Sequence, residues 1–488
     1  MQLLQRALAS HRAGRLADAE LGYNSVLEAN PEQPDALHLK GVIALQRGDP
    51  RSAVSLISKA IVARPQQGAY YSNLAAALEQ LGLSDRAYEY AQKAVALSSA
   101  DSQAWVVLGA VSRTRGSLQD AATAYREAHR LDRSNRAALD AALDCLRDLG
   151  RHDEIISSVE ALIDSADDDL KIRRAQALRA LNRFDEALAG MNACSRHDGF
   201  NWHVNMLKLW LESGQPLRGL ANGQALLCLK DALATQRFHE SGAIDPRIHW
   251  EGPAAPFCPN SNDAPERNVV CFSLWGDNPK YTLHAVLNAK RVPLLYPGWG
   301  ARFYVDESVP ADIVCALRDY GARVIEVAAD QRTHLKLFWR FLASDDPSVE
   351  RFLCRDCDSV VNEREAAAVR EWLASGKRFH VMRDHPEHAE LMMAGMWGGV
   401  AGLLPALTDQ AVDYFAAHQQ KWRWVDQDFL RDRVWPLIRQ DCLVHDAFYV
   451  FGEDCRQFPA HPPIPEGDHV GGYRPRFQMD SHHGASPD

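Results

Sequence analysis

Basic residues are under-represented in this sequence. It contains 54 lysines and arginines against 64 aspartates and glutamates, which gives a formal net charge of −10. Proteins that bind nucleic acid usually carry a basic patch, so this balance argues against a nucleic-acid partner. With 488 residues, 46% of them hydrophobic and 24% charged, the chain has the composition of a soluble globular protein with two or more domains.

Long hydrophobic runs are also scarce. The one long uncharged stretch, "LMMAGMWGGVAGLLPAL", is at the short limit for a membrane span and is interrupted by glycine and proline. We therefore expect it to form buried core and loop. The first residues, "MQLLQRALASHRAGRL", carry charges within the first turns and are not typical of a secretory signal. The sequence predicts a cytoplasmic protein with no integral membrane segment.

Cysteine spacing excludes a secreted disulfide scaffold. The ten cysteines are scattered along the chain, which is typical of reduced thiols. Cys354 and Cys357 have Cys-x-x-Cys spacing, but no second pair completes a zinc site. We interpret that spacing as coincidental, with Cys354 a small buried hydrophobe. A phosphate-binding loop, a dinucleotide-binding fingerprint and a nucleophile elbow are all missing from the sequence.

The first half of the chain is an internal repeat. Glycines recur every 34 residues, at Gly14, Gly48, Gly82, Gly116 and Gly150. Five positions after the first four glycines the chain has Ala19, Ala53, Ala87 and Ala121. The glycines fit tight turns between two helices, and the alanines fit close helix–helix contact. Two divergent units follow, centred on Asn182 and Gly214.

This pattern resembles the tetratricopeptide repeat from about Met1 to Lys230. The resemblance implies an all-α superhelix with a concave groove that binds a protein or peptide. A passive spacer or an oligomerisation arm is the alternative, which leaves a homo-oligomer open. We place the repeat domain at 1–235, a linker rich in proline, glycine and asparagine at 236–266, and a second domain at 267–488.

The second domain alternates strand-like and helix-like segments. "NVVCFSLWG", "RFYVDE", "ARVIEVA", "RFLCRDCDS" and "RFHVMRD" read as strands, whereas "ADIVCALRDYG" and "REAAAVREWLASG" read as helices. Such alternation predicts a mainly parallel sheet flanked by helices. Ligands bind such sheets at the carboxyl ends of the strands, where Asp356 and Asp358 lie.

Asp356 and Asp358 follow an apolar strand with one residue between them. In an extended segment, residues two apart face the same side, so both carboxylates can face one ligand. Two like charges repel unless a cation lies between them, and the candidates are a metal ion, Arg355 or solvent. Oxygen ligands suit Mg²⁺ or Mn²⁺, which in turn suits a diphosphate leaving group.

Three later stretches add to this motif. "MMAGMWGG" predicts an apolar glycine-rich turn that lets a ligand approach the backbone closely. In "WVDQDFLRDRVWP", Asp426, Gln427 and Asp428 come ahead of a predicted helix. In "CLVHDAF", His445 follows an apolar strand.

This order of motifs resembles the A-type-fold (GT-A) glycosyltransferases, most closely the retaining, glycogenin-like and bacterial galactosyltransferase-like group, over about Asn268 to Val450. The resemblance implies an α/β nucleotide-diphospho-sugar transferase domain that uses Mn²⁺ or Mg²⁺ and most simply a UDP-sugar. It implies metal ligands at Asp356, Asp358 and His445. It also implies sugar- and acceptor-side catalytic groups at Asp426, Gln427 and Asp428.

Further donor contacts come from the same resemblance. Asp277, Asn278 and Tyr281 would contact the base and ribose, as the first strand of that family meets the nucleotide. The lysine that usually follows the histidine of the family is missing from "HDAFYVFGED", so the phosphate clamp needs another cation. The candidates are Arg355, Lys280 and Arg383.

The stretch "FHVMRDHPEHAEL" has two interpretations. Arg383, Asp384 and His385 are expected to line the active-site cleft as sugar-binding groups. A zinc site at His385 and His388 is the alternative, although Pro386 intervenes. Among the tryptophans, Trp397 in the glycine turn is the one expected to stack on a sugar or base.

The sequence therefore predicts a metal-dependent transferase that moves a sugar from a nucleotide-sugar to an acceptor. The repeat groove suggests a protein or peptide acceptor, because tethering raises its effective concentration. One alternative acceptor is a surface polysaccharide or lipid, and another possibility is a repeat scaffold with a non-catalytic second domain. The tail from about Gly452 is expected to be irregular.

Overall fold

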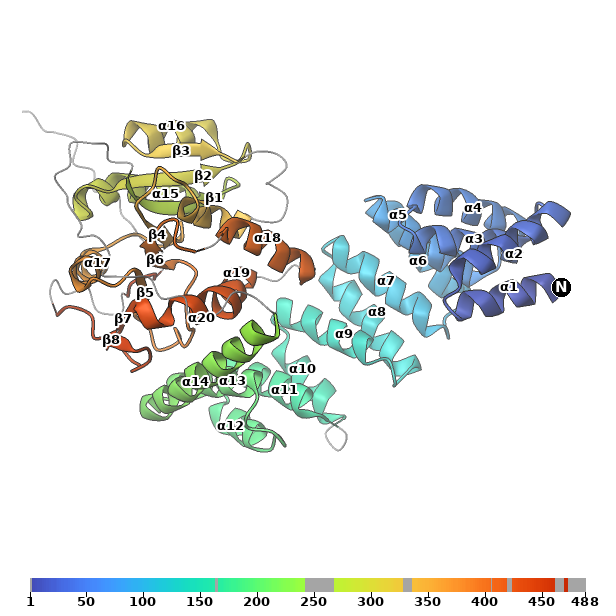
Figure 1. The fold of residues 1–488 in the computed structure, drawn as a ribbon. Helices are drawn as coiled ribbons and strands as arrows, with labels where there is room; N and C mark the ends of the chain where they lie inside the picture. Colours follow the sequence, from blue (N-terminus) through green and yellow to red (C-terminus); the bar gives the residue numbers. More distant parts are fainter. Residues whose placement is uncertain are drawn as a thin grey trace, which may run out of the picture. The chain divides into compact units, whose positions relative to one another are not determined.

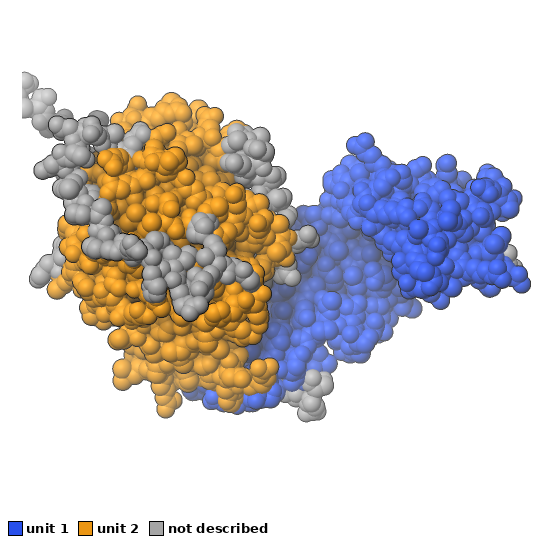
Figure 2. Space-filling view, in the orientation of Figure 1, with its two compact units in different colours: residues 1–195 blue, residues 196–488 orange. Residues whose placement is uncertain are grey.

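The computed structural model describes residues 2–162, 166–241, 267–327, 336–404, 406–418, 424–460 and 469–472. The chain forms two compact units, residues 1–195 and residues 196–488, which Figure 2 colours blue and orange. Most of the predicted linker, 242–266, lies outside the described residues, as do 461–468 and 473–488 of the tail. None of the described helices combines the length and apolar character needed to cross a membrane.

The first unit consists of helix pairs (Figure 1). Its helices are α1 (Gln2–Arg12), α2 (Leu16–Ala29), α3 (Pro34–Gln46), α4 (Pro50–Ala63), α5 (Gly68–Gln80), α6 (Ser84–Leu97), α7 (Ser102–Thr114), α8 (Leu118–Leu131), α9 (Arg136–Asp148), α10 (His152–Glu160), α11 (Asp168–Ala180) and α12 (Phe184–Asn192). The predicted repeat is confirmed, since each repeat glycine occupies the turn between the two helices of a pair.

Backbone conformation explains why the repeat needs glycine at these turns. The five repeat glycines have φ between 69° and 79°, a left-handed conformation that is costly for other residues. At the divergent unit, Asn182 adopts the same conformation with φ 59°, and asparagine tolerates it better than most residues. The predicted alanine positions are buried at helix–helix contacts, with Ala19, Ala53, Ala87 and Ala121 all at 0% exposure.

The second unit begins with two long helices, α13 (Phe200–Glu212) and α14 (Pro216–Glu240). A mixed eight-stranded sheet follows in the order β3-β2-β1-β4-β6-β5-β7-β8. The strands are β1 (Asn268–Leu274), β2 (Gly300–Val305), β3 (Arg323–Glu326), β4 (Arg351–Arg355), β5 (Phe379–Arg383), β6 (Met396–Val400), β7 (Cys442–Asp446) and β8 (Asp454–Arg456). All neighbouring strands are parallel except β6, which is antiparallel to both β4 and β5.

Helices and short helical turns cover both faces of this sheet. They are α15 (Pro279–Leu295), α16 (Ala311–Asp319), η3 (Lys336–Ser344), α17 (Glu363–Ser375), α18 (Leu407–Ala417), α19 (Val425–Phe429), η4 (Leu430–Val434), α20 (Trp435–Ile438) and η5 (Arg439–Asp441). Side chains of β1 alternate between two cores, because successive residues of a strand point to opposite faces. Val270 and Phe272 join α15–α17 in one core, whereas Val269 and Cys271 join α14, η3 and α18–α20 in the other.

The helix α14 is therefore part of the core of the second unit. Leu226, Leu227, Ala234 and Phe238 belong to the same hydrophobic cluster as the sheet residues of β1 and β4. Helix α14 continues past Thr235, where the sequence predicted the start of a linker.

Two local predictions were wrong. The "MMAGMWGG" stretch is not a turn throughout, because Met396–Val400 form strand β6 between β4 and β5. Its glycines allow close strand packing: a Cβ on Gly398 would lie 2.3 Å from the backbone oxygen of Phe352. Asp426, Gln427 and Asp428 do not precede a helix but form part of α19 itself.

Candidate functional site

The site begins at the point where the sheet reverses its strand order. From β1 the chain proceeds to β2 and β3 on one side, and then returns to place β4 on the other side of β1. Parallel sheets open a crevice at the carboxyl ends of the strands at such a switch point. The segment after β1 carries Asp277 and Asn278, and the segment after β4 carries Asp356 and Asp358.

Arg340 is the centre of this arrangement. Its side chain is 4% exposed, and its guanidinium donates to Asp356 from one nitrogen and to Asp426 from another, the latter at 2.7 Å. Its backbone N–H also donates to the hydroxyl of Ser273 at the end of β1, at 2.9 Å. Arg340 therefore joins β1, the turn after β4 and helix α19. No sequence motif marks this residue, which lies in an aromatic stretch of η3.

Asp358 faces a different cation. Its carboxylate lies 2.8 Å from the ammonium of Lys280 in the first turn of α15. The side chain of Asn278 caps this helix by accepting from the backbone N–H of Lys280 at 3.0 Å. Asp277 and Tyr281 flank the same turn and are exposed. The structure thus brings the predicted base and ribose group of residues next to one of the two aspartates.

Gly395 leaves the space that the carboxylate of Asp356 occupies. A Cβ on this glycine would lie 2.0 Å from a carboxylate oxygen of Asp356 and 2.5 Å from its Cγ. Any other residue at this position would have to displace that carboxylate. The sequence predicted that a ligand approaches the backbone at this glycine-rich stretch; the group that lies against Gly395 in the structure is the carboxylate of Asp356.

Burial and charge act in opposite directions on the central residues. Burial raises the pKa of Asp426 to about 6, although Arg340 partly opposes this. Burial disfavours the charge of Arg340, but Asp356 and Asp426 outweigh it and hold its pKa above the ordinary value. Asp426 can therefore take up a proton in mildly acidic solution, which changes the charge beside Asp356.

Asp428 is separated from these groups. One of its oxygens accepts from Arg431 at 2.6 Å, and the side chain lines a cavity next to α14. Burial raises the pKa of this carboxyl. Asp426 and Asp428 lie on the same short helix but contact different residues, Arg340 and Arg431. The half-buried Gln427 lies between them in the sequence.

His445 is not brought together with the aspartates. It lies on β7, which is three strand spacings from β4, or roughly 14 Å across the sheet. Its Nδ1 pairs with His380 at 2.8 Å and its Nε2 with Glu371 at 3.0 Å. Burial lowers the pKa of both histidines, so the pair is held as neutral imidazoles.

These positions decide how a divalent cation fits the site. Within the described ranges, no group of three histidine, cysteine, aspartate or glutamate side chains could hold a metal ion. Mg²⁺ is commonly held by one or two carboxylates, with substrate phosphates and water completing its shell. Asp356, with its side chain 48% exposed, and Asp358 fit that type of shell. A shell that includes His445 does not fit.

Other candidates from the sequence are structural. Arg355 is 1% exposed and donates to Glu365 and to the backbone oxygen of Cys354, so it is not beside the carboxylates as a clamp. Arg383 is fully buried against Asp446 at 2.6 Å. Asp384 is buried and accepts from Arg364 at 2.8 Å. These contacts occupy the groups that were expected to bind the sugar or phosphate.

The remaining motifs also belong to the core. Trp397 is buried between Phe341 and Phe352 and cannot stack on a ligand. Cys354 and Cys357 are buried free cysteines; the sequence predicted burial of Cys354. The ring centroids of His385, His388 and His469 lie 4.5–5.4 Å from one another. Among the described residues, however, these three histidines do not form a group that could hold a metal ion.

Comparison with known proteins identifies the repeats. Residues 5–206 match the tetratricopeptide repeat family. Human tetratricopeptide repeat protein 36 is 34% identical over 108 residues, which are 21% of this chain and 57% of that protein. This chain thus spans a little over half the length of that curated relative.

Solved structures of repeat proteins are similar in part. A crystal structure of MamA covers 38% of this chain and 94% of its own, with 20% identity and a TM-score of 0.28. A tetratricopeptide repeat protein from Parabacteroides merdae covers 47% of this chain and 92% of its own, with 16% identity and a TM-score of 0.32. Residues 5–206 are tetratricopeptide repeats, and a sheet-containing carboxyl-terminal region follows them.

Proposed function

We propose that the second unit is a glycosyltransferase that takes a nucleotide-sugar as its donor. The observation that carries this proposal is the placement of Asp356 and Asp358 at the switch point between β1 and β4, where open α/β sheets bind ligands. The order of motifs that resembles the A-type-fold enzymes supports the same function.

The donor would lie across the ends of β1 and β4. Asp277, Asn278 and Tyr281 are exposed at the start of α15 and can contact a base and ribose. Lys280 is half-buried beside Asp358 and is, with Arg340 beside Asp356, a cation available to a diphosphate. Asp356 and Asp358 would hold Mn²⁺ or Mg²⁺, which when bound neutralises the departing diphosphate.

The transfer step exchanges one bond for another. A hydroxyl oxygen of the acceptor bonds to the anomeric carbon of the sugar, and the bond from that carbon to the diphosphate breaks. Its electron pair leaves with the nucleotide diphosphate, and the hydroxyl proton passes to a base or to solvent. Asp426 acts here as a positioning residue, because it contacts Arg340, which in turn contacts Asp356. Gln427 beside it is the group available to the sugar.

Metal-dependent binding of UDP tests the proposal. Calorimetry of the purified chain with UDP should show binding in Mn²⁺ that is abolished by EDTA and by the double change Asp356→Ala, Asp358→Ala. A variant with Asp454→Ala, a partly exposed acid on β8 that pairs with Arg456, should bind as the unchanged protein does. If neither UDP nor GDP binds in Mn²⁺, the transferase proposal fails.

A repeat scaffold with a non-catalytic second unit is the second candidate. It is favoured by the match of residues 5–206 to tetratricopeptide repeats. Asp356, Asp358 and Asp426 also have cationic side-chain partners in Arg340 and Lys280 without any metal. On this proposal the protein binds a partner peptide through its repeats, and Asp356→Ala leaves its function intact.

A further inference from the structure

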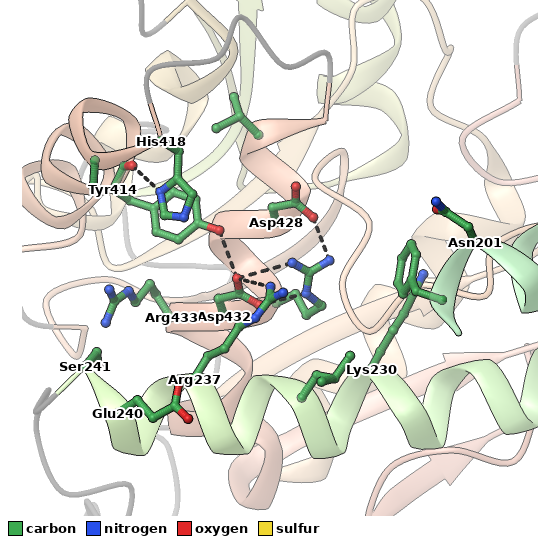
Figure 3. A pocket seen from close by; sticks show the side chains of 15 residues that line it. Asn201, Lys230, Arg237, Glu240, Ser241, Tyr414, His418, Asp428, Asp432 and Arg433 are labelled. Carbon is green, nitrogen blue, oxygen red and sulfur yellow. Dashed lines mark hydrogen bonds and ion pairs between the residues drawn. The ribbon is translucent and has the colours of Figure 1, made fainter. Parts of the chain in front are cut away.

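A large cavity within the second unit has no role in the donor site. It has a volume of about 1090 Å³ and lies between α14 and the segment formed by α18, α19 and η4 (Figure 3). We name it the helix pocket; Phe200, Leu233, Arg237, Tyr414, Asp428 and Arg433 are among the residues that line it. Pockets for small ligands commonly measure roughly 300–1,000 Å³, so this one has room for more than a single monosaccharide.

The floor of the helix pocket is a fixed polar network. Asp432 is 4% exposed and accepts from Arg237 at 2.9 Å, from the hydroxyl of Tyr414 at 2.9 Å and from Arg431 at 2.7 Å. Figure 3 shows Arg237 from α14 and Tyr414 from α18 reaching Asp432. A buried network with its partners in place holds its side chains in one arrangement. The pocket is therefore preformed.

The charges around the helix pocket are balanced. Among the described residues, its lining carries four basic side chains, Lys230, Arg237, Arg431 and Arg433, and three acidic ones, Glu240, Asp428 and Asp432. Glu390 pairs with Lys230 at 2.5 Å and supplies a fourth negative charge. A strongly anionic ligand would face the acids, and a strongly cationic ligand would face the arginines. Neither class fits a lining of this kind.

A neutral, hydroxyl-rich ligand does fit. Each hydroxyl both donates and accepts, so it can bridge a guanidinium and a carboxylate. Arg237, with its side chain 51% exposed, offers donors, and Asp428 offers an oxygen beyond the one bonded to Arg431. The stacked rings of Tyr414 and His418, with centroids 4.0 Å apart, give the pocket an aromatic side.

Helix α19 contributes one residue to the helix pocket and another to the donor site. Asp428 lines the pocket, and Asp426, two residues before it, contacts Arg340 and through it Asp356. We propose that the helix pocket is the acceptor subsite and that it binds a carbohydrate, so that the acceptor already carries a sugar. This inference rests on the proposed transferase function, and it makes α14 a wall of the acceptor site.

Direct binding of simple sugars tests the inference apart from the transferase function. The probes are the methyl glycosides of glucose, galactose, mannose and N-acetylglucosamine, measured on the full chain by saturation-transfer NMR. Leu233→Trp places an indole in the pocket, and Leu217→Trp is its control because Leu217 lies on the same helix and is 82% exposed. We expect at least one glycoside to bind, and Leu233→Trp to weaken that binding at least about tenfold.

A second pair of variants tests the inference independently, in case Leu233→Trp does not fold. Arg237→Ala removes a donor of the pocket, and Arg218→Ala removes an exposed arginine of the same helix that donates to Gln215, three residues before it. Glycoside binding should fall several-fold in the first and stay unchanged in the second. UDP binding in Mn²⁺ should be retained in all four variants.

Each other result has a definite meaning. Retained UDP binding with no glycoside bound, or with glycoside binding unaffected by Leu233→Trp, overturns the inference and leaves the transferase in place. Serine- and threonine-containing peptides that lose binding in Leu233→Trp, while glycosides never bind, overturn it in favour of a peptide subsite. Glycoside binding that is lost in Leu233→Trp, in a protein that binds no nucleotide, keeps the carbohydrate site and removes the transferase.

Discussion

The guanidinium of Arg340 lies 2.7 Å from a carboxylate oxygen of Asp426, and the two side chains are 4% and 5% exposed. This buried ion pair joins η3 to α19 across 86 residues of sequence. The same guanidinium bonds to Asp356. The charge state of one residue in α19 is thereby coupled to the carboxylate that we propose to hold the donor.

Loss of the Arg340 side chain should destabilise the second unit strongly. In Arg340→Met, Asp426 remains buried without its cation, and breaking one side of a buried pair costs about 3–5 kcal/mol. Arg456→Met is the matched control, since Arg456 pairs with Asp454 at a surface where both are partly exposed. Its cost should stay below about 1 kcal/mol. Urea denaturation followed by tryptophan fluorescence compares the two, and equal costs would contradict a structural role for Arg340.

The raised pKa of Asp426 predicts a pH dependence of stability. Its folded-state pKa is about 6 and its ordinary value is 3.8, so between these values the folded protein holds a proton that the unfolded chain has released. The contribution of Asp426 to the free energy of unfolding is therefore fully present below about pH 4 and is lost as the pH rises to about 6. A difference of this size corresponds to on the order of 3 kcal/mol.

Asp426→Asn removes the titrating group, so this part of the pH dependence should disappear. The measurement is the free energy of unfolding of both proteins at several pH values from 4 to 7. The absolute stability of the variant matters less than its slope, because the asparagine also weakens the contact with Arg340. Parallel curves for the two proteins would show that Asp426 keeps its ordinary pKa in the fold.

His445 should be dispensable for metal-dependent UDP binding. Both of its ring nitrogens have partners, His380 on β5 and Glu371 on α17. Strands β6 and β5 lie between β7, which carries His445, and β4, which precedes Asp356. We expect His445→Gln to bind UDP in Mn²⁺ with unchanged affinity, although the orphaned His380 costs about 1–3 kcal/mol of stability. Asp358→Asn should weaken binding at least about tenfold. Equal losses in the two variants would restore His445 as a ligand.

The repeat unit offers a test of helix packing. A Cβ on Gly109 of α7 would lie 2.8 Å from the ring of Tyr125, so Gly109→Ala should destabilise the first unit by about 1–3 kcal/mol. A Cβ on Gly190 of α12 would meet only the guanidinium of Arg174, at 3.7 Å. Because alanine favours a helix over glycine, Gly190→Ala should stabilise by about 0.5–1 kcal/mol. Thermal unfolding of both variants measures the two signs, and a Gly109→Ala protein as stable as the parent would contradict the contact.

Much of the fold was predictable because local physics dictates it. The 34-residue spacing of glycine located the first five turns, since each requires a left-handed residue. Asn182 follows Gly150 after 32 residues, so the divergent unit was found at a looser spacing. The apolar runs located β1, β4, β5 and β7, each fully buried. Strand β6 was missed because Gly398 and Gly399 within it, and Gly395 just before it, belong to a residue type with low strand propensity. The structure uses these glycines for close packing, which the sequence does not reveal.

The site was less predictable because its residues meet through topology. Asp356 and Asp358 were found, since an acid pair after an apolar strand is a local pattern. Arg340 was not, because its partners Asp356 and Asp426 lie 16 and 86 residues away along the chain. Arg355 and Arg383 were overvalued for the same reason: sequence alone cannot show that Glu365 and Asp446 lie beside them in the core.

Gly395 offers the most direct test of how the fold positions Asp356. Gly395→Ala places a methyl group where the carboxylate of Asp356 now lies, 2.0 Å from its oxygen, so that carboxylate must move. Gly399→Ala is the matched control, because its Cβ would meet the ring of Phe379 at 2.5 Å and not the site. Both changes overpack the sheet and should cost about 1–3 kcal/mol in chemical denaturation. Only Gly395→Ala should weaken metal-dependent UDP binding in calorimetry, since only it displaces a proposed ligand. If both variants lose UDP binding equally, the effect belongs to β6 as a whole, and if neither does, Asp356 does not hold the donor.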